Sequence, residues 1–263
     1  MDRHLGWRCA TLQSKIIIPM AAEIKDILNN RINIINQSKG IYLTNKIYQI
    51  QISLLALEKN YKELEKSLID YSNPRISSKL WEHGHKERAR LYLWNVSRLL
   101  QNFLSSAATF RDHVRYLTRQ IFRDHVFLDE FKNKIKNTFG DDPLSNFIMI
   151  FRNNYLHTCV AATSASFKLD FNNHRIISSI LISKKQLLDT YSEWTVKSKD
   201  YINTLPDEVP LLVIVKEYYD KVYIFYQWYE QRYFKIFEDE FVELTKLKED
   251  YSQLQKKLFN IKK

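Results

Sequence analysis

A short segment in the second half of the chain combines residue types that can cleave RNA without a metal ion. It contains Arg152, Asn153 and His157, with four residues between the arginine and the histidine. A neutral histidine can accept the proton of a ribose 2′-hydroxyl, and a protonated one can give a proton to the leaving 5′-oxygen. The arginine stays protonated, and its planar guanidinium can bind the negative charge that develops on the phosphate oxygens. Arg152, Asn153 and His157 are therefore the candidate catalytic residues, with Asn153 as the positioning group.

The same segment has an ordinary structural interpretation. On a regular helix the side chains of Arg152 and His157 point about 140° apart, so they converge only if the helix ends or distorts near His157 or a second subunit completes the site. Otherwise Arg152 and Asn153 cap a helix or form ion pairs. A second arginine–histidine pair, Arg119 and His125 with five residues between them, competes with the first. Residue types and spacing alone leave both pairs open.

An arginine, a polar residue and a histidine after four to six intervening positions resemble the signature of the HEPN superfamily. The resemblance favours Arg152 and His157 over Arg119 and His125, because Asn153 is the usual kind of residue after the arginine and the flanking segments fit. It continues in the small-residue segment Leu104–His113, in the approach Phe147–Asn153 and in the hairpin that follows, and it covers about residues 90–235. It is strongest with a group of uncharacterised bacterial HEPN-like proteins. Many members of the superfamily look like metal-independent ribonucleases of toxin and antiviral systems.

The resemblance implies a helical fold, an RNA substrate, no metal and no cofactor. We expect a homodimer, because a site of two or three groups is too sparse to hold RNA alone and the long apolar helix stripes could pair. The resemblance adds a composite site between paired protomers and, for a toxin, a possible antitoxin or regulatory protein as partner. The alternative function is a non-catalytic helical scaffold, or a module that binds RNA or a partner protein. A third interpretation, compatible with either function, is that a regulatory partner binds the apolar stripe between residues 47 and 71.

Three arginines, Arg111, Arg115 and Arg119, recur at intervals of four and therefore share one face of a predicted helix. Residues 86–136 hold eleven Lys or Arg and five Asp or Glu, within a chain whose formal net charge is +10. A basic surface of this kind can bind the phosphates of a nucleic acid. The alternative is a solvated helix face with local ion pairs. Arg111, Arg115 and Arg119 are the candidate nucleic-acid-binding residues.

The composition indicates a folded protein of the cytoplasm. Hydrophobic residues make up 45% of the chain, which is enough for a packed core. Cys9 and Cys159 are too few for a disulfide framework, and neither a CxxC pair nor an HExxH motif is present, so no dedicated zinc site is expected. Neither a secretion signal nor an apolar run of membrane-spanning length occurs, and we expect no membrane association.

Only four glycines and five prolines interrupt the 263 residues, which favours long helices. Apolar residues that recur every three or four positions predict helices over 43–71 and 86–122. A stretch of small and β-branched residues, a turn near 170–173 and a β-branched run at 176–182 predict one hairpin. Residues 72–85 are expected to form a linker. From about residue 243 the chain is Lys-rich and sparsely apolar, and we expect it to project or fray. Further helices are expected over 21–37 with an end near Gly40, over 127–138, after Pro143, over 184–204 and after Pro210.

These patterns predict a mainly α fold, an antiparallel helical bundle of long helices with one small β-hairpin. We expect a helical N-terminal extension at 1–80, a HEPN-like helical domain at 81–240 and a basic C-terminal helical tail at 241–263.

Overall fold

A computed structural model describes residues 23–82, 86–158, 163–170 and 175–261, without the side chains of residues 86, 156–158, 169, 175, 190 and 258–261. The contacts of the chain divide it into two compact units. The larger unit comprises residues 48–229, and the smaller one joins the described residues up to Ile47 with those from Glu230 onward. Residues 48–80 thus belong to the same unit as the candidate catalytic segment.

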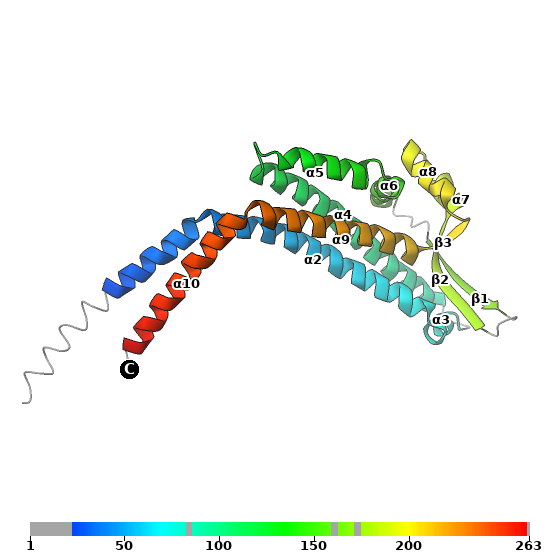
Figure 1. The fold of residues 1–263 in the computed structure, drawn as a ribbon. Coiled ribbons are helices and arrows are strands. Elements are labelled where there is room, and N and C mark those ends of the chain that lie inside the picture. The colour runs from blue at the N-terminus through cyan, green and yellow to red at the C-terminus, as the bar shows by residue number, and fades with distance from the viewer. Residues whose placement is uncertain (1–22, 83–85, 159–162, 171–174, 262–263) are drawn as a thin grey trace, which may run out of the picture. The chain divides into compact units, whose positions relative to one another are not determined.

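Three long helices form the centre of the larger unit: α2 (Lys39–Ser72), α4 (Lys86–Ile121) and α9 (Leu211–Ile236) (Figure 1). Ring contacts and hydrogen bonds show how these three helices pack. Tyr61 of α2 stacks on Tyr219 with centroids 4.1 Å apart and meets Phe103 at 6.2 Å. Ser53 bonds His113 and Ser67 bonds Tyr92, so α2 runs antiparallel to α4. The predicted mainly α fold is therefore confirmed.

The apolar stripe of α2 is core. Its residues from Ile47 to Tyr71 are between 0% and 6% exposed. Burial of this kind supplies the main driving force for folding. It also removes the stripe as a surface for a partner protein, because the same side chains already pack inside this chain.

The predicted hairpin is present and carries a third strand. β1 (Thr163–Asp170), β2 (Arg175–Ser183) and β3 (Glu208–Pro210) form an antiparallel sheet in the order β1-β2-β3. The expectation of a single hairpin missed β3, because a three-residue strand that ends in proline has no alternating pattern of its own. Ser178 Oγ donates to the carbonyl oxygen of Tyr71 at 2.9 Å, which fixes the sheet to the end of α2.

Two segments differ from the sequence-based expectation. The linker at 72–85 contains α3 (Pro74–Leu80), because Asn73 caps it and proline is well suited to a first helical position. The helix expected at 184–204 is split into α7 (Lys184–Thr190) and α8 (Val196–Thr204). The buried Trp194 donates from Nε1 to the Leu187 carbonyl between them at 2.9 Å, and Thr195 caps α8.

The helix expected at 127–138 is α5 (Phe127–Ile135), extended by a π-helical turn, η1 (Lys136–Gly140). α6 (Pro143–Thr158) follows and packs against both α4 and α8. Proline at its first position confirms the start predicted at Pro143. α6 carries the candidate catalytic segment, so its contacts with α4 decide what surrounds Arg152.

In the smaller unit, residues 23–37 are helical, and the first residues of α2 contact the end of α9 and α10 (Glu238–Ile261). Tyr233 donates its hydroxyl to the Leu43 carbonyl at 2.8 Å, and Lys39 pairs with Glu240 at 2.5 Å. The helical tail expected at 241–263 is present to Ile261 as most of α10, which buries Leu244. Gly40, expected to end a helix, lies within the first turn of α2.

Gly40 is required because another helix approaches its backbone. A Cβ at this position would lie 2.7 Å from the Glu240 carbonyl oxygen and 2.7 Å from Leu244 Cβ. We expect Gly40→Ala to lower the free energy of unfolding by about 1–3 kcal/mol, the usual effect of overpacking. Thermal and urea unfolding followed by circular dichroism will measure it. In the matched control Gly140→Ala, the added Cβ meets no atom closer than 3.7 Å, so stability should hardly change; equal losses in the two variants would contradict the packing argument.

Candidate functional site

The start of α6 is fixed by Asp142. Its Oδ2 accepts from the Ser145 backbone N–H at 2.7 Å and from Ser145 Oγ at 2.6 Å, and its Oδ1 pairs with Lys221 at 2.5 Å. Burial alone would raise the pKa of the Asp142 carboxyl, but the hydrogen bonds from Lys221 and Ser145 outweigh it and hold that pKa below its ordinary value. α6 is thus fastened to α9 at its first turn.

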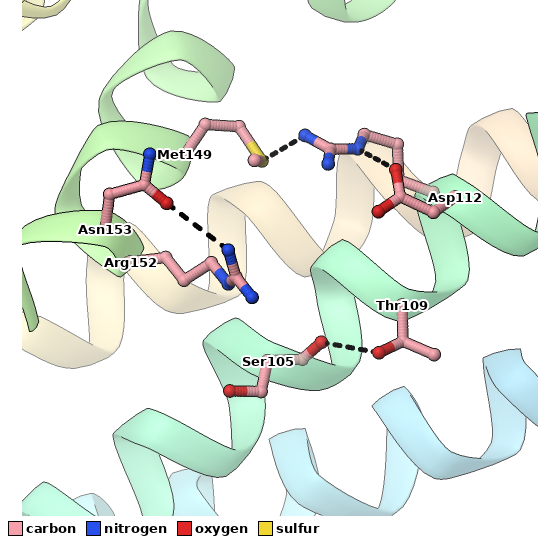
Figure 2. Close-up of polar contacts among 7 residues, drawn as sticks. Ser105, Thr109, Asp112, Met149, Arg152 and Asn153 are labelled. Carbon is pink, nitrogen blue, oxygen red and sulfur yellow. Dashed lines mark hydrogen bonds and ion pairs between the residues drawn. The ribbon is translucent and has the colours of Figure 1, made fainter. Parts of the chain in front are cut away.

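Arg152 lies on the part of α6 that faces α4. Its side chain is half-buried, and Figure 2 shows it pointing toward the segment of α4 that carries Ser105 and Thr109. Nη1 donates to Asn153 Oδ1 at 3.3 Å, a long bond, and the buried Nε–H has no hydrogen-bond partner. A buried donor without an acceptor costs about 1–3 kcal/mol. The orphaned Nε–H of a charged group marks Arg152 as a position where an anion would fit.

One helical turn before Arg152, α6 is joined to α4 by Met149. Arg111 donates from Nη1 to the Met149 sulfur at 2.7 Å and from Nε to Asp112 Oδ1 at 2.9 Å (Figure 2). A thioether is a weak acceptor, and Asp112 is a neighbour with a side chain that is 60% exposed. Arg111 therefore keeps most of its capacity to bind an anion.

His157 occupies the last turn of α6, which continues to Thr158, and its side chain lies outside the described residues. Helical spacing directs the Cβ atoms of positions 152 and 157 about 140° apart. The structure thus brings Arg152 and Asn153 into contact. The backbone of α6 stays helical through position 157, so the chain shows no helix end before that position.

The competing pair is separated by the end of α4. Arg119 is exposed on that helix, whereas His125 follows it and accepts the Phe127 backbone N–H at Nδ1, 3.0 Å away. The His125 ring also meets Phe122 edge-on with centroids 5.7 Å apart. These contacts give His125 a local structural role between α4 and α5.

The three predicted arginines line two adjoining pockets of the larger unit. Arg111 and Arg115 border a pocket between α4, η1, α6 and α9, and Arg115 and Arg119 border a second one between α4, α5 and η1. Lys132 and Lys136 stand on the opposite wall of the second pocket, and no carboxylate lines either pocket. We call Arg111, Arg115, Arg119, Lys132 and Lys136 the cationic groove.

Lys132 and Lys136 are site residues that the sequence reasoning missed. The signal was present, because the two lysines are four apart and therefore share one face of a helix. What the sequence could not supply was the packing of that face opposite the arginines of α4.

The cations of the groove repel one another. Burial lowers the pKa of the Arg115 guanidinium, and the positive charge of Arg111 lowers it further. Arg115 has neither a hydrogen bond nor an ion pair with the part of the chain that the structure describes. A bound anion would relieve this repulsion, so the electrostatics of the groove favour a negatively charged ligand.

Among the described residues, no three His, Cys, Asp or Glu side chains are placed to hold a metal ion. None of the helices in the described ranges combines the length and the apolar character needed to cross a bilayer. Comparison with models of protein families, with curated proteins and with solved structures finds no match for this chain.

Proposed function

We propose that this protein is a metal-independent endoribonuclease of the HEPN type that binds its substrate through the cationic groove. One observation carries the proposal. The half-buried guanidinium of Arg152 has an Nε–H without an acceptor and no carboxylate partner in the described structure. A buried N–H without an acceptor destabilises the fold, so a purely structural role does not explain it. A phosphate oxygen would accept this hydrogen bond.

In the proposed reaction, His157 acts as the general acid or base, Arg152 binds the phosphate and its developing charge, and Asn153 orients Arg152. A neutral imidazole takes the 2′-hydroxyl proton, and the 2′-oxygen then attacks the adjacent phosphorus. The bond to the 5′-oxygen breaks, and that oxygen leaves with a proton from an imidazolium. The products are a 2′,3′-cyclic phosphate and a 5′-hydroxyl, and no metal or cofactor takes part.

Positions 152 and 157 are five apart on α6, so ideal helical spacing points them to different faces. We propose a homodimer in which the histidine of one protomer faces the arginine of its partner. An RNA-cleaving protein of this kind would serve in toxicity or antiviral defence in the bacterial cytoplasm, with an antitoxin or regulatory protein as its control. These roles rest on the resemblance of the chain to HEPN proteins.

The second candidate function is RNA binding without cleavage, by a helical scaffold. It is favoured by the same angle of about 140° that ideal helical spacing sets between positions 152 and 157. Incubation of the purified protein with RNA in EDTA separates the two candidates, because only the nuclease leaves 2′,3′-cyclic phosphate ends.

RNA binding through the cationic groove should depend steeply on salt, because each phosphate contact releases counterions. We expect the triple variant Arg111→Gln, Arg115→Gln, Arg119→Gln to flatten the slope of log K against log salt by about 2, since each contact with single-stranded nucleic acid contributes roughly 0.7. Fluorescence anisotropy with a labelled RNA between low and moderate salt will measure it.

The matched control replaces Lys59, Lys62 and Lys66 by Gln. These lysines are exposed on α2 in the same unit, so the control changes the net charge equally at another face. If both triple variants flatten the slope alike, RNA binding is a matter of total charge and the groove is not its path.

A further inference from the structure

The pocket between α4, η1, α6 and α9 has a volume of about 200 Å³. Most of its wall is apolar or aromatic and includes Phe110, Phe139 and Phe225. Phe139 meets Phe225 edge-on, with centroids 5.1 Å apart and planes at 71°. The wall thus offers aromatic edges and faces to a ligand rather than a hydrated surface.

η1 shapes one side of this pocket. The π-helical turn Lys136–Gly140 supplies Phe139 and Gly140 to the wall. Single π-helical turns are rare and are often found at functional sites. A π-helical turn contains one residue more than an α-helical turn and is less stable. Placing Phe139 against a ligand would be a reason to keep it.

Two cations line the same pocket, and no carboxylate does. Arg115 has no acceptor in the described chain, whereas Arg111 donates from Nε to Asp112 and from Nη1 to the Met149 sulfur, which leaves its Nη2 for a ligand. Burial and the nearby positive charge of Arg111 lower the pKa of the Arg115 guanidinium. A single anionic group between them would accept charged hydrogen bonds from both.

A buried tyrosine adds a second polar feature. Tyr218 is 3% exposed, forms part of the pocket wall and has no hydrogen-bond partner in the described part of the chain. Burial raises the pKa of its hydroxyl to about 12, and the positive charges of Arg111 and Arg115 oppose this rise with a smaller effect. The hydroxyl is therefore neutral at physiological pH. It is thus available to donate to a ligand in the pocket.

Asn146 supplies an acceptor. Its amide nitrogen donates to the carbonyl oxygens of Gly140 at 3.2 Å and Asp142 at 2.8 Å, which leaves Oδ1 free to accept from a ligand. The pocket therefore combines an apolar floor with two cationic donors, one hydroxyl and one amide oxygen.

We propose that this pocket binds a small aromatic anion, a molecule with one planar ring and one phosphate or carboxylate group. The ring would lie against Phe139 and Phe225, and the anionic group would lie between Arg111 and Arg115. The volume is below the roughly 300–1,000 Å³ of sites for drug-sized ligands, so one ring system fits and a longer molecule does not. Inorganic phosphate would leave the apolar floor empty, and an aliphatic acid would not use the aromatic edges.

This inference goes beyond the proposed function, because the ligand is a small molecule held in the aromatic pocket, although Arg111 and Arg115 also belong to the cationic groove. Its test contains no RNA, so its outcome and that of the ribonuclease assays are independent. The probe is phenyl phosphate, with inorganic phosphate and phenol as the two halves of the ligand.

Isothermal titration of the full chain should detect phenyl phosphate binding at least roughly tenfold tighter than either half, since only the whole ligand uses both the floor and the arginines. Arg115→Gln should weaken phenyl phosphate roughly tenfold or more, and Tyr218→Phe by a smaller factor. The control Arg98→Gln removes an equal charge from an exposed position on α4, bonded to Asn95, and should bind like the parent.

Thermal unfolding of each variant shows whether it is folded, so that a loss of binding can be assigned to the pocket rather than to misfolding. Equal affinity for phenyl phosphate and inorganic phosphate would overturn the proposal, because the apolar floor would then have no part in binding. So would a folded Arg115→Gln protein that binds phenyl phosphate as the parent does.

Discussion

Replacing His157 by alanine should lower the rate of RNA cleavage at least about a hundredfold, the usual scale for the loss of a general acid or base. The activity of the parent should persist in EDTA and leave 2′,3′-cyclic phosphate ends, because the site activates the 2′-hydroxyl rather than a metal-bound water. DNA, which lacks this hydroxyl, should be bound at most. Gel analysis of end-labelled RNA and chemical identification of the 3′ ends will measure both results.

Two further variants separate the chemistry from general damage. Arg152→Lys keeps the charge but loses the planar fork, so cleavage should fall by roughly 10²–10³. His125→Ala should cleave like the parent, because the Nδ1 of His125 is already used by the Phe127 backbone N–H. If His125→Ala is inactive and His157→Ala is active, the competing pair carries the chemistry. If both cleave like the parent, the proposed nuclease site is wrong.

Mixing variants tests whether two protomers share the site. If the arginine of one protomer works with the histidine of its partner, refolding Arg152→Lys together with His157→Ala should restore about a quarter of the parent activity. Half of the dimers are then mixed, and one of the two equivalent sites in each is intact. If each site lies within one protomer, no mixed dimer has an intact site and the activity stays at the level of the variants.

The long helices could be predicted from the sequence because their signal is local. The stripes of α2 and α4 repeat every three or four residues, and the structure buries them as expected. The short elements could not be predicted equally well. α3 has only seven residues, and the break before α8 depends on Trp194 bonding back to Leu187. Such elements are selected by contacts across the fold rather than by their own pattern.

The candidate site shows the same division. Spacing alone placed Arg111, Arg115 and Arg119 on one helix face, and the structure confirms that α4 is continuous there. Spacing could not tell which elements face these arginines, so Lys132, Lys136 and the aromatic floor of the pocket were missed. A spacing of four identifies a helix face, but only the packing of α5, α6 and α9 turns that face into a groove.

Replacing Phe147 by alanine should have the largest effect on stability of any single substitution considered for this chain. The Phe147 ring is fully buried and stacks on Phe151 at 5.3 Å and on Trp194 at 5.5 Å, with Tyr201 at 5.1 Å. Its removal loses the transfer free energy of the ring and leaves a cavity among rigid rings that cannot collapse. We expect the free energy of unfolding to fall by about 3–5 kcal/mol.

Urea unfolding followed by tryptophan fluorescence and circular dichroism will measure this loss, and Phe147→Leu should fall between the parent and the alanine variant because it fills part of the cavity. The matched control is Tyr116→Ala on α4, where the side chain is 61% exposed and the change should stay within about 0.5 kcal/mol. Phe147 lies five residues before Arg152 on α6, so the variant should also weaken the support of the candidate site. A loss below about 1 kcal/mol for Phe147→Ala would mean that this aromatic cluster does not anchor α6, and the placement of Arg152 beside α4 would then need another support.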